Sequence, residues 1–292
     1  MNRKVSVIVP VLNAEKKLPR VLEALSVQTY PKDSTEIIVV DNGSDDNTLQ
    51  IARQFDVNLL IEKKQGPYAA RNHGVNASKG EIVALLDSGT VPTPQWIEEG
   101  MRCIATQHVD LVGGNIVFSM EPGATAGEVY DAITFANNRK LVEEGSAAGG
   151  NLFFKKVVWA KIGSFPEHRT GMDIWWTQKA TKNGFKIGFS EKAVVHYQPR
   201  GWIRGLRKSY RVGTMHPYNM RSSGKSVFYV IWHTIQCFFP QDPLKIRNKM
   251  AQLDQSFSYS FFFKVWLVAS TNKISMGFGR LRGLVMLNKL ML

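Results

Sequence analysis

Four short apolar segments near the start of the chain constrain the fold more than any other feature. They cover residues 5–12, 36–40, 58–62 and 82–87, and helix-like patterns separate them. Continuous apolar runs of this length are typical of strands that are buried on both faces. The alternating order predicts an α/β fold, in which a mostly parallel sheet is covered by helices on both faces.

Polar residues follow three of these predicted strands. Pro10 and Asn13 lie at the end of the first segment, Asp41 follows the second, and Asp87 follows the fourth. In parallel α/β sheets, ligands bind at the carboxyl ends of the strands, so these residues are candidates for a binding site. Each of them alone is more often a turn or cap residue, and the case depends on their occurring together.

The second loop, Asp41–Asp45, has the chemistry of a nucleoside site. Asp41 places a carboxylate where a base or ribose can donate to it, and Gly43 allows a close backbone approach. Neither a G-x-G-x-x-G motif nor a P-loop follows the first strand. A dinucleotide-dependent hydride carrier or an NTPase would therefore lack its phosphate-binding loop.

Four ordered motifs carry a family resemblance. They read SVIVPVLNAEKKL, EIIVVDNGSDDNT, GPYAARNHGVNASKGEIVALLDSGT and GGNLFFKKVVWAKIGSFPEHRTGMDIWW. In order and spacing they resemble the family 2 glycosyltransferases of GT-A fold, over roughly residues 4–200. The resemblance implies a Rossmann-like domain that catalyses inverting transfer of a sugar, usually from a UDP-sugar, to an acceptor hydroxyl. A glycan or a lipid-linked saccharide is the acceptor that we expect, as in polysaccharide biosynthesis.

The resemblance also implies which side chains bind the nucleotide-sugar. The loop after the first strand and the acid after the second hold the nucleoside, and the arginine of the ARN stretch lies near the nucleotide. The implied set is Pro10, Asn13, Asp41, Gly43, Arg71, Asp87 and Ser88.

The metal-binding motif departs from the family pattern. The family usually reads DxD at the end of the fourth strand, whereas this chain reads Asp87-Ser88-Gly89. His196, at the end of a predicted short strand, matches a histidine that often approaches the metal in the family. We expect Mn²⁺ or Mg²⁺, held weakly by Asp87 and His196. Three alternatives stay open: a metal-independent enzyme that uses cations of the tail, an inactive homologue, and a purely structural histidine.

The resemblance places the general base at Asp173. The family opens a helix with an acidic pair, and here that pair reads Met172-Asp173, so the second acid is kept. From its position alone, Asp173 is better interpreted as a helix cap, and it is the register of the family motif that favours the base. Trp175 or Trp176 is expected to line the acceptor site, with the other in the core, because adjacent helical residues point apart. Glu167 and Asp131 are the fallback candidates for the base.

The charge is divided sharply along the chain. Residues 1–199 are neutral overall, whereas residues 200–292 contain 15 Lys and Arg against two acids and carry the whole net charge of +13. We therefore predict a catalytic domain over residues 1–199 and a basic, aromatic-rich helical region over residues 200–292. Arg204, Arg207 and Arg211 follow helical spacing, which suits either the leaving diphosphate or an anionic membrane, or a solvated face.

Two aromatic segments in the basic region suggest a membrane surface as a partner. Residues 227–239 and 257–269 are both shorter than the ~20 apolar residues that a spanning helix needs. They suit amphipathic helices in the lipid interface, and we expect a peripheral protein on the cytoplasmic side of the cell membrane. An added helical layer or a homo-oligomer interface is the alternative.

Other classes of protein receive little support. The start of the chain does not read as a signal peptide, because the apolar run is brief and is broken by Pro10. Cys103 and Cys237 are too few and too far apart for a disulfide framework or a zinc site. No RNA-binding motif is present, so nucleic acid is not an expected partner. The competing function is a catalytically silent, membrane-bound protein that binds nucleotide-sugars.

Overall fold

The computed structural model describes residues 4–120, 122–135, 137–167, 170–222, 224–253 and 257–290. The chain divides into two compact units. The first combines Met1–Phe118 with Ala136–Gln198, and the second combines Ser119–Phe135 with Pro199–Leu292. The charge pattern gave no indication that residues 119–135 would group with the basic tail.

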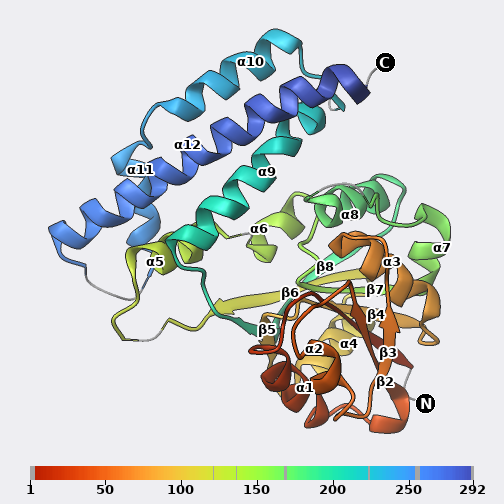
Figure 1. Ribbon diagram of the computed structural model, residues 1–292. Coiled ribbons are helices and arrows are strands. Elements are labelled where there is room, and N and C mark those ends of the chain that lie inside the picture. Colours follow the sequence, from red (N-terminus) through yellow and green to blue (C-terminus); the bar gives the residue numbers. More distant parts are fainter. Residues whose placement is uncertain are drawn as a thin grey trace. The chain divides into compact units, whose positions relative to one another are not determined.

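The first unit is built on one mixed sheet, whose described strands run in the order β3-β2-β1-β4-β7-β6-β8-β5 (Figure 1). The strands are β1 (Val5–Val11), β2 (Thr35–Asp41), β3 (Asn58–Ile61), β4 (Ile82–Leu86), β5 (Thr90–Pro92), β6 (Leu111–Phe118), β7 (Asn151–Lys155) and β8 (Ile187–Tyr197). Strands β1 to β4 are mutually parallel, which confirms the predicted α/β core. Strand β7 is antiparallel to both β4 and β6.

Helices cover both faces of this sheet. The apolar side chains of β1 alternate between the faces: Val7 lies in one core cluster and Ile8 in the other, and neither is exposed to solvent. The first cluster includes residues of α1 (Leu18–Ser26), α2 (Thr48–Ala52) and α4 (Trp96–Thr106). The second includes residues of α3 (Pro67–Ala77), α7 (Lys156–Ile162) and α8 (Met172–Lys182), and α6 (Asn138–Glu143) packs against it. The apolar runs of β1 and β4 therefore mark strands buried on both sides, whereas β3, at the end of the strand order, is half-exposed.

Helix α3 lies very close to the sheet because of a glycine. A Cβ atom on Gly74 would lie 2.5 Å from Ile8 Cγ2 and 3.1 Å from Val40 Cγ2, which is too close for any side chain. The helix backbone can therefore rest directly on β1 and β2. This close packing fixes the first turns of α3, which carry Tyr68 and Arg71, relative to the strand ends.

The ends of β1, β2 and β4 and the residues before β7 lie at the same edge of the sheet. In the parallel register, Val11 pairs with Asp41, so β1 and β2 end together. Because β7 is antiparallel to β4, Leu86 pairs with Asn151, and the residues before β7 lie beside the residues after β4. The stretch Gly149–Gly150 is thereby placed next to Asp87.

The second unit is helical. It contains α5 (Ala126–Thr134), α9 (Trp202–Ser222), α10 (Val227–Ile235), η2 (Gln236–Phe238), α11 (Pro243–Met250) and α12 (Tyr259–Leu290). Its core cluster joins Val129 of α5 to Ile246 of α11 and to Val265 and Ala269 of α12. Glycines let α9 and α12 touch, since a Cβ atom on Gly279 would lie 2.1 Å from the Tyr210 carbonyl oxygen. The predicted helical tail is therefore present, and its second aromatic segment is only the start of a helix of 32 residues.

None of the described helices combines the length and the apolar character that crossing a membrane requires.

Candidate functional site

Asp41, the last residue of β2, is buried and only partly satisfied. Its side chain is 1% exposed, and its Oδ2 accepts the backbone N–H groups of Gly43 and Ser44, both at 3.1 Å. Gly43 has φ +88°, a conformation that favours glycine. Among the described residues, Oδ1 of Asp41 is buried and has no hydrogen-bond partner. A buried acceptor of this kind is costly unless a donor reaches it.

The loops after β1 and β2 are tied to each other. The Asn13 N–H donates to Ser44 Oγ at 2.9 Å, and Asn13 Oδ1 accepts from the Asp45 N–H at 3.0 Å. The Ala14 N–H donates to Thr48 Oγ1 at 2.8 Å. The structure thus brings Asn13 beside the Asp41 loop, as the sequence suggested. Pro10 lies within β1, opposite Val40 of β2.

Arg71 and Asp87 form an ion pair between α3 and the end of β4. Arg71 Nη2 lies 2.5 Å from Asp87 Oδ1, and the two side chains are 7% and 35% exposed. Burial alone would lower the pKa of Arg71, but the charge of Asp87, with smaller contributions from Tyr68 and Asp173, outweighs it and raises that pKa. Arg71 therefore carries a permanent positive charge at the strand end.

Asp173 lies in the first turn of α8 and is held by groups outside its own helix. Its Oδ1 accepts from the Tyr68 hydroxyl at 2.8 Å, and its Oδ2 accepts from the Gly149 N–H at 2.6 Å. The Tyr68 hydroxyl in turn accepts from the Met172 N–H at 2.9 Å. Burial, and then the charge of Asp173, raise the pKa of Tyr68, so that hydroxyl stays a donor. Helix α8 has no side-chain cap bond, so the carboxylate of Asp173 does not serve as its cap.

Consecutive glycines bring the two carboxylates to one stretch of backbone. A Cβ atom on Gly149 would lie 3.1 Å from Asp173 Oδ2, and a Cβ atom on Gly150 would lie 3.0 Å from Asp87 Oδ2. Any larger residue at either position would crowd a carboxylate. We did not predict Tyr68, Gly149 or Gly150 from the sequence. The GG pair before a strand was the available signal, whereas nothing local marks Tyr68.

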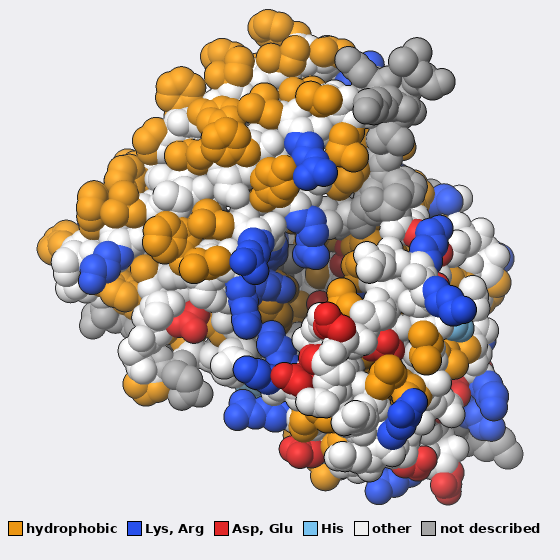
Figure 2. Space-filling view, in the orientation of Figure 1, with side chains coloured by type: hydrophobic (Ala, Val, Ile, Leu, Met, Phe, Trp, Pro, Cys, Tyr) orange, Lys and Arg blue, Asp and Glu red, His pale blue; other side chains and the backbone are white. Residues whose placement is uncertain are grey.

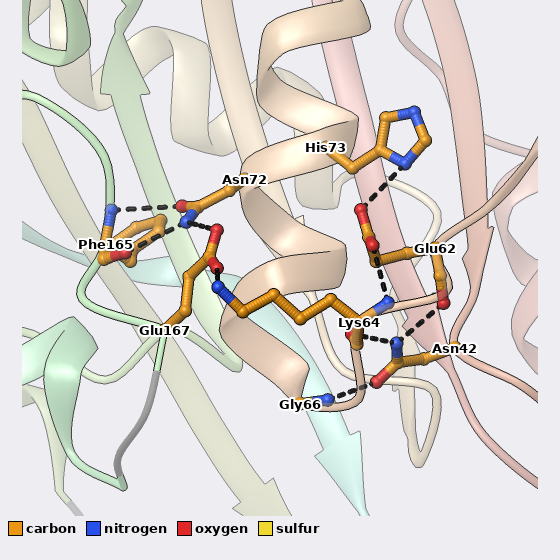
Figure 3. Close-up of polar contacts among 8 residues, drawn as sticks. All are labelled: Asn42, Glu62, Lys64, Gly66, Asn72, His73, Phe165 and Glu167. Carbon is orange, nitrogen blue, oxygen red and sulfur yellow. Dashed lines mark hydrogen bonds and ion pairs between the residues drawn. The ribbon is translucent and has the colours of Figure 1, made fainter.

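Asn42 organises the loop between β3 and α3 (Figure 3). Its Nδ2 donates to the carbonyl oxygens of Glu62 at 3.0 Å and Lys64 at 2.8 Å, and its Oδ1 accepts from the Gly66 N–H at 2.6 Å. His73 Nδ1 lies 3.2 Å from Glu62 Oε2, which is a further contact to the same loop. These bonds fix the start of α3, and with it Tyr68 and Arg71.

Asn72 and Lys64 fix the segment that leads into α8 (Figure 3). Asn72 Nδ2 donates to the Phe165 carbonyl oxygen and to Glu167, both at 2.9 Å, and Asn72 Oδ1 accepts from the Phe165 N–H. Lys64 Nζ lies 2.6 Å from Glu167 Oε2. Both carboxylate oxygens of Glu167, a fallback candidate for the base, therefore have partners, and one of these partners is the cation Lys64.

The predicted metal ligands do not form a metal site by themselves. Asp87 Oδ1 is already paired with Arg71, and Gly89 has no side chain that could bind a metal. Asp87, Ser88 and Gly89 are all half-buried. His196 is exposed on β8, opposite Val91 of β5, so it lies near the segment that follows Asp87. In the described part of the chain, no three His, Cys, Asp or Glu side chains gather as metal ligands. The protein donors alone therefore do not fit a divalent cation.

The two tryptophans of α8 have different surroundings. Trp175 is 44% exposed, and Lys179 Nζ lies 5.4 Å from its ring centre. Trp176 is fully buried, and its Nε1 donates to the Gly163 carbonyl oxygen at 2.7 Å. Of the two, Trp176 is therefore the one in the core, where its side chain cannot reach an acceptor. Trp175 stays a candidate.

The basic residues of the tail belong to the second unit. Arg204, Arg207 and Arg211 are exposed along α9. Lys208 is not part of that exposed stripe, because it pairs with Asp131 at 3.3 Å, and Arg200 pairs with the same acid at 3.4 Å. Asp131, the other fallback candidate for the base, is 5% exposed. Its carboxylate therefore pairs with two cations of that unit and is largely removed from solvent.

The amino-acid sequence of this chain matches a known family. The family model described as "Glycosyl transferase family 2" matches residues 6–161. The chain belongs to glycosyl transferase family 2. It is 36% identical over 288 residues to glycosyltransferase AglE of Haloferax volcanii, a match that covers 95% of each chain. It is also 33% identical over 212 residues to the poly(ribitol-phosphate) β-N-acetylglucosaminyltransferase TarS of Staphylococcus aureus, which covers 68% of this chain and 36% of TarS. The chain is accordingly a glycosyltransferase.

Solved structures agree with the GT-A type of fold. TarS residues 1–349 in complex with UDP-GlcNAc superpose with a TM-score of 0.55 at 22% identity, covering 73% of this chain and 67% of that one. The mannosyltransferase PcManGT of Pyrobaculum calidifontis, in complex with GDP-Man and Mn²⁺, superposes with a TM-score of 0.58 at 17% identity. That match covers 100% of this chain and 76% of PcManGT. At these identities the likeness concerns the fold alone.

The contact between Tyr68 and Asp173 leads to a first prediction. Tyr68→Phe removes the donor to Asp173 Oδ1 and the acceptor of the buried Met172 N–H, so we expect a loss of about 1–3 kcal/mol in the free energy of unfolding. Because the carboxylate loses its fixed orientation, kcat should fall on the order of tenfold. Urea unfolding and steady-state kinetics measure the two effects. Tyr130→Phe in the second unit is the control, and equal kinetics in both variants would contradict the positioning role.

Proposed function

We propose that this glycosyltransferase moves a sugar from a UDP-sugar to an acceptor hydroxyl of a glycan or lipid-linked saccharide, with inversion, at the cytoplasmic face of the cell membrane. The observation that carries the proposal is the placement of Asp87 and Asp173 against consecutive glycines at one edge of the sheet. In this proposal Asp87 lies toward the donor diphosphate, and Asp173 accepts the proton of the acceptor hydroxyl.

The partly satisfied carboxylate of Asp41 supports uracil as the base. In uracil the ring N3 carries a hydrogen, which can donate to the Asp41 oxygen that lacks a partner among the described residues. TarS, whose structures contain UDP and UDP-GlcNAc, is consistent with this choice. The loop residues Pro10, Asn13 and Gly43 would surround the nucleoside, with Arg71 and Ser88 toward the diphosphate. A guanine nucleotide, as PcManGT binds, is the competing donor.

The chemical step needs one base and one stabilised leaving group. Asp173 would accept the proton of the acceptor hydroxyl while its oxygen attacks the anomeric carbon. The bond from that carbon to the diphosphate oxygen breaks on the opposite side, and its electron pair leaves with UDP. The product therefore has inverted configuration. Because Gly149 and Tyr68 already bond to Asp173, its carboxylate is oriented before the acceptor arrives.

A divalent cation would be bound only together with the donor in this proposal. Asp87 is the acid kept from the DxD motif, and His196 is the predicted second ligand, so most ligand oxygens would come from the diphosphate and water. When bound, such a cation would neutralise negative charge on the leaving UDP.

The exposed apolar side chains of the second unit support membrane association (Figure 2). On α10 and the residues after it, Phe228 is 78% exposed, Trp232 52% and Phe239 62%. Further exposed side chains line α12: Tyr259, Phe263, Leu267, Phe278, Leu281, Val285 and Met286. Aromatic rings of this kind lie at the acyl boundary of a bilayer, while Arg204, Arg207 and Arg211 could meet anionic headgroups. A homo-oligomer would be the alternative cover for these side chains.

A second prediction tests the nucleoside assignment. Asp41→Asn replaces an acceptor with a donor at one oxygen, so the affinity for UDP should fall by about 1–3 kcal/mol. Calorimetric titration with UDP measures the loss. Asp45→Asn, at an exposed position of the same loop, is the matched control and should change little. CDP, whose ring lacks the N3 hydrogen, should bind the parent protein more weakly than UDP. Unchanged UDP affinity in Asp41→Asn would remove Asp41 from the site.

The third prediction concerns the base. Asp173→Asn keeps the size of the side chain but cannot take a proton, so turnover should fall roughly 10²–10⁴-fold. The affinity for UDP should stay nearly unchanged, because the base acts in the transition state. Transfer assays and calorimetry separate the two quantities, and NMR of the product reports its anomeric configuration. Near-normal turnover, or a product with retained configuration, would be incompatible with the assignment.

The fourth prediction concerns the membrane. Replacing Phe228 and Trp232 together with serine should weaken binding to anionic liposomes by roughly a hundredfold or more, since each buried aromatic ring contributes about 1.5–3 kcal/mol. Salt should release the parent protein only in part, because aromatic burial is not screened. Ile61→Ser with Val157→Ser changes two exposed apolar residues of the first unit and is the control in sedimentation assays. If both double variants bind equally, the surface is not a membrane anchor.

A further inference from the structure

The residue that departs from the DxD pattern faces a cation. Gly89 follows Asp87 in a tight turn, in which the Thr90 N–H donates to the Asp87 carbonyl oxygen at 3.0 Å and Thr90 Oγ1 donates to it at 2.7 Å. A Cβ atom on Gly89 would lie 3.4 Å from Lys17 Nζ and 3.8 Å from Lys17 Cδ. A side chain at position 89 would therefore point at the ammonium group of Lys17.

The backbone of Lys17 is fixed beside the nucleoside loops. The N–H groups of Lys17 and Leu18 both donate to the Ala14 carbonyl oxygen at 2.9 Å. Ala14 is bonded to Thr48, so this turn is tied to the loop after β2. Lys17 is the residue directly before α1 and is half-buried, which limits the directions its side chain can take.

The local charge balance distinguishes this edge from a DxD site. Asp87 is already paired with Arg71, so these two charges offset each other. A second carboxylate at position 89 would add negative charge and attract a metal ion. This chain has no side chain there, and the Lys17 ammonium lies 3.4 Å from where a Cβ atom of residue 89 would be. The exchange makes the edge more positive without a metal, which suits an anionic ligand.

We propose that Lys17 binds the diphosphate of the donor at the place where a third-position aspartate would otherwise hold a metal ion. This proposal rests on the proposed function, because it needs a nucleoside diphosphate at Asp41 and Asp87. The ammonium donates to diphosphate oxygens and stabilises the negative charge that develops when the bond to the anomeric carbon breaks and its electrons leave with UDP. Lys17 has another contact of its own, and the diphosphate joins or replaces it. Nucleotide binding then depends on Lys17 and only weakly on divalent cations.

Calorimetric titration with UDP and with uridine, in EDTA and in Mn²⁺, tests the proposal on the full chain. In EDTA, Lys17→Met should bind UDP roughly tenfold or more weakly than the parent, since a hydrogen bond to a charged group is lost. Uridine, which lacks the diphosphate, should bind both proteins equally. Lys16→Met is the matched control, because Lys16 is the exposed neighbour in the sequence, and it should behave like the parent. Thermal unfolding confirms that the variants fold.

Gly89→Asp adds an independent arm. Position 89 has no strained backbone, and an added Cβ meets only the flexible end of Lys17, so the variant should fold. The new carboxylate pairs with Lys17, so UDP affinity in EDTA should drop. The double variant Lys17→Met with Gly89→Asp should bind UDP well in Mn²⁺ and poorly in EDTA.

The outcomes separate the two proposals. If the parent binds no UDP in either condition, the proposed function fails. If the parent binds UDP but Lys17→Met behaves like Lys16→Met, the role of Lys17 is wrong and the proposed function survives. Loss of UDP binding by the parent in EDTA would likewise overturn the role of Lys17, because a metal would then hold the diphosphate.

Discussion

The ion pair between Arg71 and Asp87 is the contact around which the candidate site is arranged. It joins helix α3 to the end of β4, and both partners have lost much of their solvent. Removing one charge of a buried pair leaves the other uncompensated, at a cost of about 3–5 kcal/mol when burial is complete. The half-open position of Asp87 reduces that cost. The pair therefore fixes the end of β4 and helix α3 relative to each other, and the other polar contacts of the site depend on this arrangement.

Backbone groups orient the remaining acids. Asp41 accepts two N–H groups of its own loop, and Asp173 accepts the N–H of Gly149. Because these donors belong to the main chain near strand and helix ends, the carboxylates are positioned by the fold and not by mobile side chains. Tyr68 is the exception, and it lies on the buried face of α3, where Gly74 holds the helix against the sheet. Close packing far from the ligand thus determines the geometry of the acid at α8.

The sequence was informative for features that depend on residues close together in the chain. Apolar runs placed β1 to β4 correctly, and the family motifs identified the chain as a glycosyltransferase. Contacts between distant segments were not accessible in this way. The antiparallel strand β7, which brings Gly150 to Asp87, depends on pairing across more than sixty residues. Trp176 was ambiguous because two adjacent tryptophans on a helix point apart, and only packing decides which one enters the core. The grouping of residues 119–135 with the tail is equally non-local.

The glycine at position 89 illustrates how a site can still supply positive charge to a diphosphate without a second carboxylate that binds a metal ion. A diphosphate must be met by positive charge, and a carboxylate contributes to that only indirectly, through a metal ion. In our proposal Lys17 supplies this charge directly, from a turn that is bonded through Ala14 to the loop after β2. A lysine requires fewer neighbouring groups than a metal ion, because it needs neither several ligands nor a fixed coordination geometry. The same edge of the sheet can therefore retain Asp87, paired to Arg71, as a structural anchor of the turn even when its role as a metal ligand is diminished.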